Sequence, residues 1–133
     1  MLFRSDPLTK EVLDHASFCL RKCKSFYGRE DFLGTIRDGL INSKGERVVV
    51  IHGESGCGKT SILAKIVKDV KRWLENQTCL AVFRFLGTSP DSSSARLLLR
   101  SICQQLCKLT GQNTAYIPDV SIASLQTLNC DVS

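Results

Sequence analysis

A short glycine-rich stretch near the middle of the chain, GESGCGKT from Gly53 to Thr60, constrains the fold more than any other feature. It follows the apolar, β-branched run RVVVIH and precedes a segment, KTSILAKIVKDVKRW, whose apolar residues recur at helical spacing. We therefore predict a strand, a glycine loop and a helix in that order. In this context the spacing Gly-x-x-x-x-Gly-Lys-Thr is typical of a loop that wraps a phosphate group, although a glycine-rich turn carrying Lys-Thr by coincidence is the alternative.

The chemistry of such a loop depends on its backbone. Glycines at positions 53, 56 and 58 permit positive φ and let amide hydrogens point inward, and the following helix adds the positive end of its dipole. We expect Lys59 to reach the β- and γ-phosphates, Thr60 to bind Mg²⁺ through its hydroxyl, and Ser61 to lie near the α-phosphate. No catalytic side chain is predicted. The expected nucleotide-binding residues of the loop are Gly53, Glu54, Ser55, Gly56, Cys57, Gly58, Lys59, Thr60 and Ser61.

The remaining pattern places helices and a second strand around this unit. Residues 6–23 and 31–41 have helical apolar spacing, with Asp6 as N-cap and Pro7 as the first helical residue. The run CLAVFRFL (79–86) is typical of a strand, and a helix follows that ends at Gly111. This order predicts an α/β fold, namely an incomplete P-loop NTPase-type parallel sheet with two strands visible and helices on both faces. The predicted segments are a helical lead-in at 1–45, the first half of a nucleotide-binding core at 46–111, and a weakly structured, truncated tail at 112–133.

Composition excludes several classes of protein. The net charge is +5, but the basic residues are scattered without interleaved aromatic residues, so we expect solvated helix faces and no nucleic-acid partner. No stretch approaches the roughly 20 apolar residues of a membrane span, and no signal peptide is visible, so a cytoplasmic location is expected. Seven cysteines, an odd number, favour free thiols in a reducing compartment over a disulfide framework or a metal site.

Two further stretches resemble one protein family. SFYGRED (25–31) is similar to the Gly-Arg-Glu signature that precedes the phosphate loop in STAND nucleotide-binding switches. FRFLGTSPDSSSARLLLRSICQQL (83–106) resembles the NACHT branch of that family, especially the NACHT and WD-repeat proteins. The resemblance implies an ATP- or ADP-binding module of a signalling switch that uses Mg²⁺, with sensor repeats attached and protein partners or self-association through the complete protein. It also implies that Tyr27, Gly28 and Arg29 lie beside the adenine and ribose.

One family feature is missing from this sequence. The second acidic motif, an apolar strand ending in an aspartate that orients Mg²⁺ and water, should follow the second helix of the nucleotide-binding core. We therefore expect nucleotide to be held with little or no hydrolysis by this chain alone, and we leave open whether it is an enzyme. The alternative is a non-enzymatic partner-binding fragment or short isoform, with structural nucleotide or none, that associates through an open sheet edge. The acidic residues downstream of the loop that we considered are Asp69, Glu75, Asp91, Asp119 and Asp131.

Overall fold

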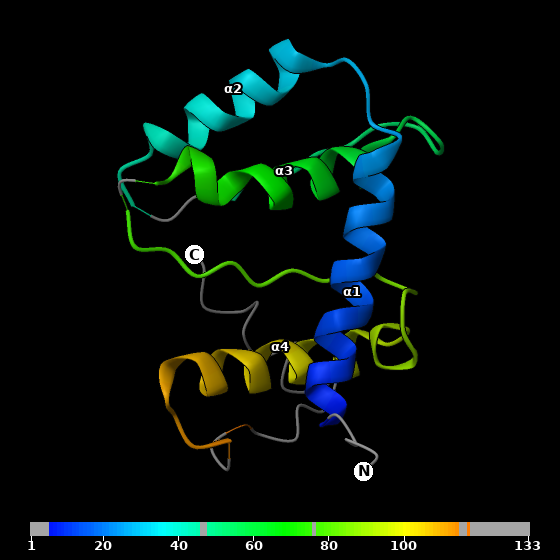
Figure 1. The fold of residues 1–133 in the computed structure, drawn as a ribbon, viewed down its shortest axis with the longest axis vertical. Helices are drawn as coiled ribbons and strands as arrows, with labels where there is room; N and C mark the ends of the chain where they lie inside the picture. Colours follow the sequence, from blue (N-terminus) through cyan, green and yellow to red (C-terminus); the bar gives the residue numbers. More distant parts are fainter. Residues whose placement is uncertain (1–5, 46–47, 76, 115–116, 118–133) are drawn as a thin grey trace, which may run out of the picture. The chain divides into compact units, whose positions relative to one another are not determined.

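The computed structural model of the chain describes residues 6–45, 48–75, 77–114 and 117. Helices dominate these residues, and each of the four predicted α-helices is present (Figure 1). Of the predicted tail at 112–133, the structure describes only residues 112–114 and 117, and the rest lies outside the described residues. The elements are α1 (Pro7–Lys24), α2 (Glu30–Ile41), α3 (Lys59–Trp73), the short 3₁₀ helix η1 (Pro90–Ser92) and α4 (Ala95–Thr110).

The predicted parallel sheet is wrong for the described part of the chain, which contains no strand. Residues 48–54 and 78–85 lack regular secondary structure, and no backbone hydrogen bond joins these two described runs. Val48 and Val50 are 88% and 74% exposed, whereas the prediction required a run buried on both faces. The physical reason is that β-branched residues favour a pleated, half-buried surface rather than a strand in itself, so a strand forms only where partner backbone is available.

The described residues fall into two compact units, one of which comprises Ala16–Ala81. Helices α2 and α3 pack side by side in it (Figure 1). The second half of α1 also belongs to this unit, where the buried Cys19 thiol donates a hydrogen bond to the carbonyl of Ala64 at 3.4 Å. The apolar core consists of Leu33, Ile36 and Ile62, with Phe26, Leu40, Ile51, Ile66 and Trp73 packed against it.

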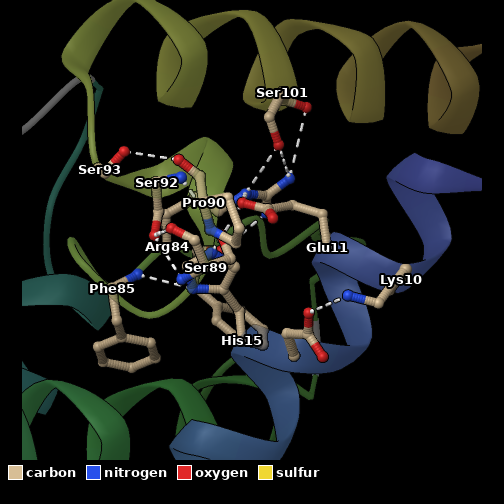
Figure 2. Close-up of polar contacts among 12 residues, drawn as sticks. Lys10, Glu11, His15, Arg84, Phe85, Ser89, Pro90, Ser92, Ser93 and Ser101 are labelled. Atoms are coloured by element: carbon tan, nitrogen blue, oxygen red, sulfur yellow. Dashed lines mark hydrogen bonds and ion pairs between the residues drawn. The ribbon is translucent and has the colours of Figure 1, made fainter.

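The other unit comprises residues up to His15 and from Val82 onward, and polar side chains fill its centre (Figure 2). The His15 ring is fully buried, and its Nδ1 accepts a hydrogen bond from the Phe85 amide at 3.0 Å. The ring proton therefore lies on Nε2, which donates to Glu11 Oε1 at 2.9 Å. Arg84 lies beside Glu11 and donates to Ser101 Oγ at 2.8 Å. The buried side chains of His15, Glu11 and Arg84 therefore all have polar partners, as burial requires.

Serine side chains set the start of α4 in the same unit. Ser89 and Ser92 exchange hydrogen bonds as a capping box around η1, and Ser94 caps the N-terminus of α4 through the amide of Leu97. The helix ends at Gly111 in the left-handed conformation, as predicted. The serine-rich stretch is thus an ordered connection with its own hydrogen bonds.

Six of the seven cysteines lie in the described residues, and all six are free thiols. None of the helices described is both long and apolar enough to cross a membrane.

Candidate functional site

The glycine loop is held at both ends by the core of its unit. Ile51, just before the loop, and Ile62, in the first turn of α3, belong to the same apolar cluster. Burying these two side chains on either side of Gly53–Gly58 brings the loop ends together, so the intervening residues form a compact turn. The Cys57 amide closes that turn by donating to the Glu54 carbonyl at 3.3 Å.

Two of the three loop glycines adopt the positive φ predicted for them. Gly56 has φ 79° and Gly58 has φ 90°, values that side-chain-bearing residues rarely adopt. Gly53 does not, and that part of the prediction is wrong. A Cβ at position 53 would lie 2.8 Å from the Cys57 sulfur, so a larger residue there would require the Cys57 side chain to move.

The N-terminus of α3 opens onto the loop without a side-chain cap. Gly58 is its N-cap residue, and the first turn contains no acidic residue. The first amide hydrogens of a helix have no partner within the helix, and the dipole places partial positive charge there. This end of α3 therefore favours an anion.

Lys59 lies folded back onto its own loop. Its ammonium donates to the carbonyl oxygens of Gly53 at 2.8 Å and Glu54 at 2.6 Å, and it lies 3.8 Å from the Cys57 sulfur. These two carbonyls hold the ammonium at the loop. A phosphate oxygen would compete with them for the same donor hydrogens.

A cavity of about 450 Å³ lies against the loop. None of the described residues that line it is acidic, and two of them carry an ammonium group. Hydroxyls and glycine backbone make up the rest, so the lining is suited to a polyanion. The lining residues are Lys22, Ser55, Gly56, Gly58, Lys59, Thr60 and Ser61.

Six of these seven lining residues, all except Lys22, were expected from the motif. Lys22 belongs to the last turn of α1, within a basic cluster that the sequence analysis assigned to a solvated helix face. The position of Lys22 in the sequence does not predict a contact with the loop, because only the packing of α1 in this unit brings this residue to the cavity. Glu54 and Cys57 take part through their backbone carbonyls rather than through the lining.

Arg29 contacts the loop directly. Its Nη2 donates to the Cys57 carbonyl at 2.8 Å, across 28 positions of sequence. Arg29 is also the N-cap residue of α2 and has φ 64°, an uncommon conformation for a residue with a side chain. The Gly-Arg-Glu segment and the phosphate-type loop are thus joined by a hydrogen bond.

Tyr27 and Gly28 lie elsewhere in the same unit. They line a separate cavity of about 410 Å³ between α2 and α3, together with Leu33 and Trp73, and Tyr27 is 87% exposed. The structure therefore brings only one of the three predicted nucleoside contacts, Arg29, to the loop. The role of Tyr27 and Gly28 stays a prediction.

Of the acidic residues considered for metal binding, Asp69, Glu75 and Asp91 lie in the part of the chain that the structure describes, and none of the three lines the loop cavity. Asp69 is buried in α3, where its carboxylate pairs with Lys65 at 3.1 Å and Arg72 at 3.4 Å. Asp91 lies in η1, and Asp119 and Asp131 lie outside the described residues. Among the described residues there is no group of three or more metal-binding side chains.

Comparison with known proteins agrees with this arrangement of motifs. The NACHT domain family matches residues 47–128, a range that contains the whole loop and α3. This chain belongs to the NACHT domain family, whose members are nucleotide-binding NTPase modules.

Its relatives are large proteins. The chain is 32% identical over 109 residues to the NACHT and WD repeat domain-containing protein 2 of Homo sapiens, and 36% identical over 106 residues to the NACHT domain- and WD repeat-containing protein 1 of the same species. These alignments cover 77% and 78% of this chain but only 6% and 7% of the relatives. No solved structure matches the chain.

Proposed function

We propose that this chain holds ATP or ADP on the loop Gly53–Ser61 as the nucleotide-binding part of a STAND-type signalling switch, with little or no hydrolysis by itself. The observation that carries the proposal is the loop cavity, because two lysines and the uncapped N-terminal turn of α3 line it and none of its described lining residues is acidic. Such a lining favours a polyphosphate over a neutral ligand.

The residues present fit a magnesium nucleotide. Backbone amides around Gly56 and Gly58 would bind the β-phosphate, Lys59 would exchange its loop carbonyls for phosphate oxygens, and Thr60 would offer its hydroxyl to the ion. Mg²⁺ supplies charge neutralisation of the phosphates when bound. Ser61 would lie near the α-phosphate.

The low-hydrolysis half of the proposal rests on the acidic residues. Positioning a water for attack on a phosphate needs a group that accepts its proton or orients it. The described lining of the loop cavity offers lysines and hydroxyls for this, and the one buried carboxylate of α3, Asp69, is engaged by two cations. We propose that turnover requires residues beyond this set.

Calorimetric titration with ATP and ADP, with and without Mg²⁺, tests binding. Lys59→Ala removes the ammonium nearest the expected phosphates and should weaken binding about 100-fold or more, since charge-assisted contacts to phosphate are the strong ones. Lys71→Ala, which removes an exposed charge near the other end of α3, is the matched control. Equal affinity of the wild type and Lys59→Ala for ATP would refute the binding site.

A phosphate-release assay on the same samples tests turnover. We expect release near the uncatalysed background. Turnover that Lys59→Ala abolishes would show that the chain contains a complete hydrolytic site, and that half of the proposal would be wrong.

Recognition of the nucleoside by Arg29 is a separate part of the proposal. Arg29 lies at the loop through the Cys57 carbonyl, so its planar guanidinium is close enough to the nucleotide site to stack on a base or to bind a phosphate. If it contacts the nucleoside, Arg29→Ala should weaken ADP more than inorganic pyrophosphate. Equal weakening of both ligands would assign Arg29 to the loop alone.

A second candidate function is partner binding without a nucleotide role. The exposed apolar run Val48–Val50 favours it, because contiguous exposed apolar side chains commonly mark interaction surfaces. Size-exclusion chromatography with light scattering separates the two candidates. Oligomers that ignore ADP would support this second function, and a monomer that binds ADP would count against it.

A further inference from the structure

Lys22 is a cation at the loop cavity that no loop motif predicts. It lies in the last turn of α1 and lines the cavity together with Lys59 and the hydroxyl residues Ser55, Thr60 and Ser61. Lys22 is half-buried, in contrast to its exposed neighbours Arg21 and Lys24. It therefore reaches the cavity from a different element than the one that forms the loop.

The charge of Lys22 is not compensated by a carboxylate within the described residues. Other lysines of the chain have such partners: Lys10 pairs with Asp14 and Lys108 pairs with Asp6. Lys22 instead lies over the Phe18 ring, with its ammonium 5.5 Å from the ring centroid. A cation–π contact one helical turn back restrains the side chain but leaves the three ammonium hydrogens free to donate to another group.

The position of Lys22 also brings like charges to one cavity. Lys59 and Lys22 both line it, and the N-terminus of α3 adds partial positive charge, while no described lining residue is acidic. Like charges at one site repel each other, so their convergence is unfavourable without a bound anion and favourable with a multiply charged one.

We propose that Lys22 is a second phosphate-binding cation, supplied by α1, that contacts the polyphosphate tail of the bound nucleotide. The inference rests on the proposed nucleotide site and extends it to an element outside the loop. The ligand class is a polyphosphate, and the contact is independent of the nucleobase. Affinity for nucleotide then depends on how α1 packs beside the loop.

The test compares ATP, ADP and inorganic tripolyphosphate by calorimetry with wild type, Lys22→Ala, Lys22→Arg and Lys59→Ala. Lys24→Ala is the matched control, because it removes the same charge from the same helix turn but does not line the cavity. Circular dichroism establishes that each variant retains the wild-type helix content.

Lys22→Ala should weaken ATP and tripolyphosphate by a similar factor of about 3 to 10, within the range of charge-assisted contacts at a half-exposed site. Lys22→Arg should retain most of the affinity, and Lys24→Ala should retain all of it. The fall in affinity with added salt should also be less steep for Lys22→Ala than for wild type, since one phosphate contact is gone.

Three results would overturn the inference in distinguishable ways. If Lys22→Ala binds like wild type while Lys59→Ala does not bind, Lys22 has no role and the proposed function stands. If Lys22→Ala and Lys24→Ala weaken binding equally, the effect is general charge and not a contact. If wild type binds neither ATP nor tripolyphosphate, the proposed function itself is wrong and this inference falls with it.

Discussion

Replacement of Arg84 by alanine should strongly destabilise the unit in which it is buried. The Arg84 side chain is 3% exposed, and its guanidinium donates to Ser101 Oγ at 2.8 Å and Gln105 Oε1 at 2.7 Å. Its Nε also lies 4.0 Å from a Glu11 carboxylate that is itself only 5% exposed. Burial lowers the pKa of Arg84, and the negative charge of Glu11 opposes that shift, so each group stabilises the charged form of the other (Figure 2).

The expected magnitude follows from what remains after the change. Arg84→Ala leaves the Glu11 carboxylate buried with His15 as its remaining partner, and breaking one side of a buried pair costs about 3–5 kcal/mol. Replacing Glu11 by glutamine in that background removes the stranded charge while keeping an oxygen that accepts from His15. The double variant should therefore recover about 1–3 kcal/mol of the loss, the penalty of an unsatisfied buried group.

Urea unfolding followed by circular dichroism measures both free energies. Gln105→Ala serves as a milder variant that stays folded, since it removes one hydrogen bond worth about 1 kcal/mol. The reasoning would be refuted if Arg84→Ala lost less than about 1 kcal/mol, or if Glu11→Gln made the Arg84→Ala protein less stable still, because then no stranded charge would limit stability.

Two further predictions concern single groups. Burial, with a smaller contribution from Cys23, raises the pKa of Cys19 to about 11. Iodoacetamide at pH 8, followed by mass spectrometry, should therefore show that the half-buried Cys103 and Cys107 are labelled well before Cys19. Rapid labelling of Cys19 in the native protein would contradict the packing of α1. A hydrogen bond from Lys108 lowers the pKa of Asp6 below its ordinary 3.8, so the ionised form stabilises the fold above that pH and the contribution is lost as the pH falls through the lowered value. Asp6→Asn removes the charge but keeps a side-chain oxygen, so it should lower the melting temperature at pH 7 and have a smaller effect at pH 3. An equal effect at both pH values would show that the Lys108 contact contributes nothing.

Some of the structure could be read directly from residue patterns, because the forces involved are local. Apolar spacing, Pro7 at a helix start and Gly111 at a helix end are set by neighbours within a turn or two, and the helices follow them closely. The strands could not be read in this way. The valine run before the loop has the composition of a strand, but pairing needs another backbone at the right distance, which no residue within the run specifies.

The residues of the candidate site likewise fall into those that a local motif predicts and those that only packing brings together. The loop could be predicted from the residues within it, because the glycines at 56 and 58 and the lysine after them have conformational and chemical requirements that act over a few residues. The distant groups that meet the loop could not be predicted: Arg29 binds its Cys57 carbonyl, Lys22 lines its cavity, and Tyr27 lies in another cavity. Contacts of this kind depend on the packing of whole helices, and that packing is decided by the summed burial of many side chains rather than by any short motif.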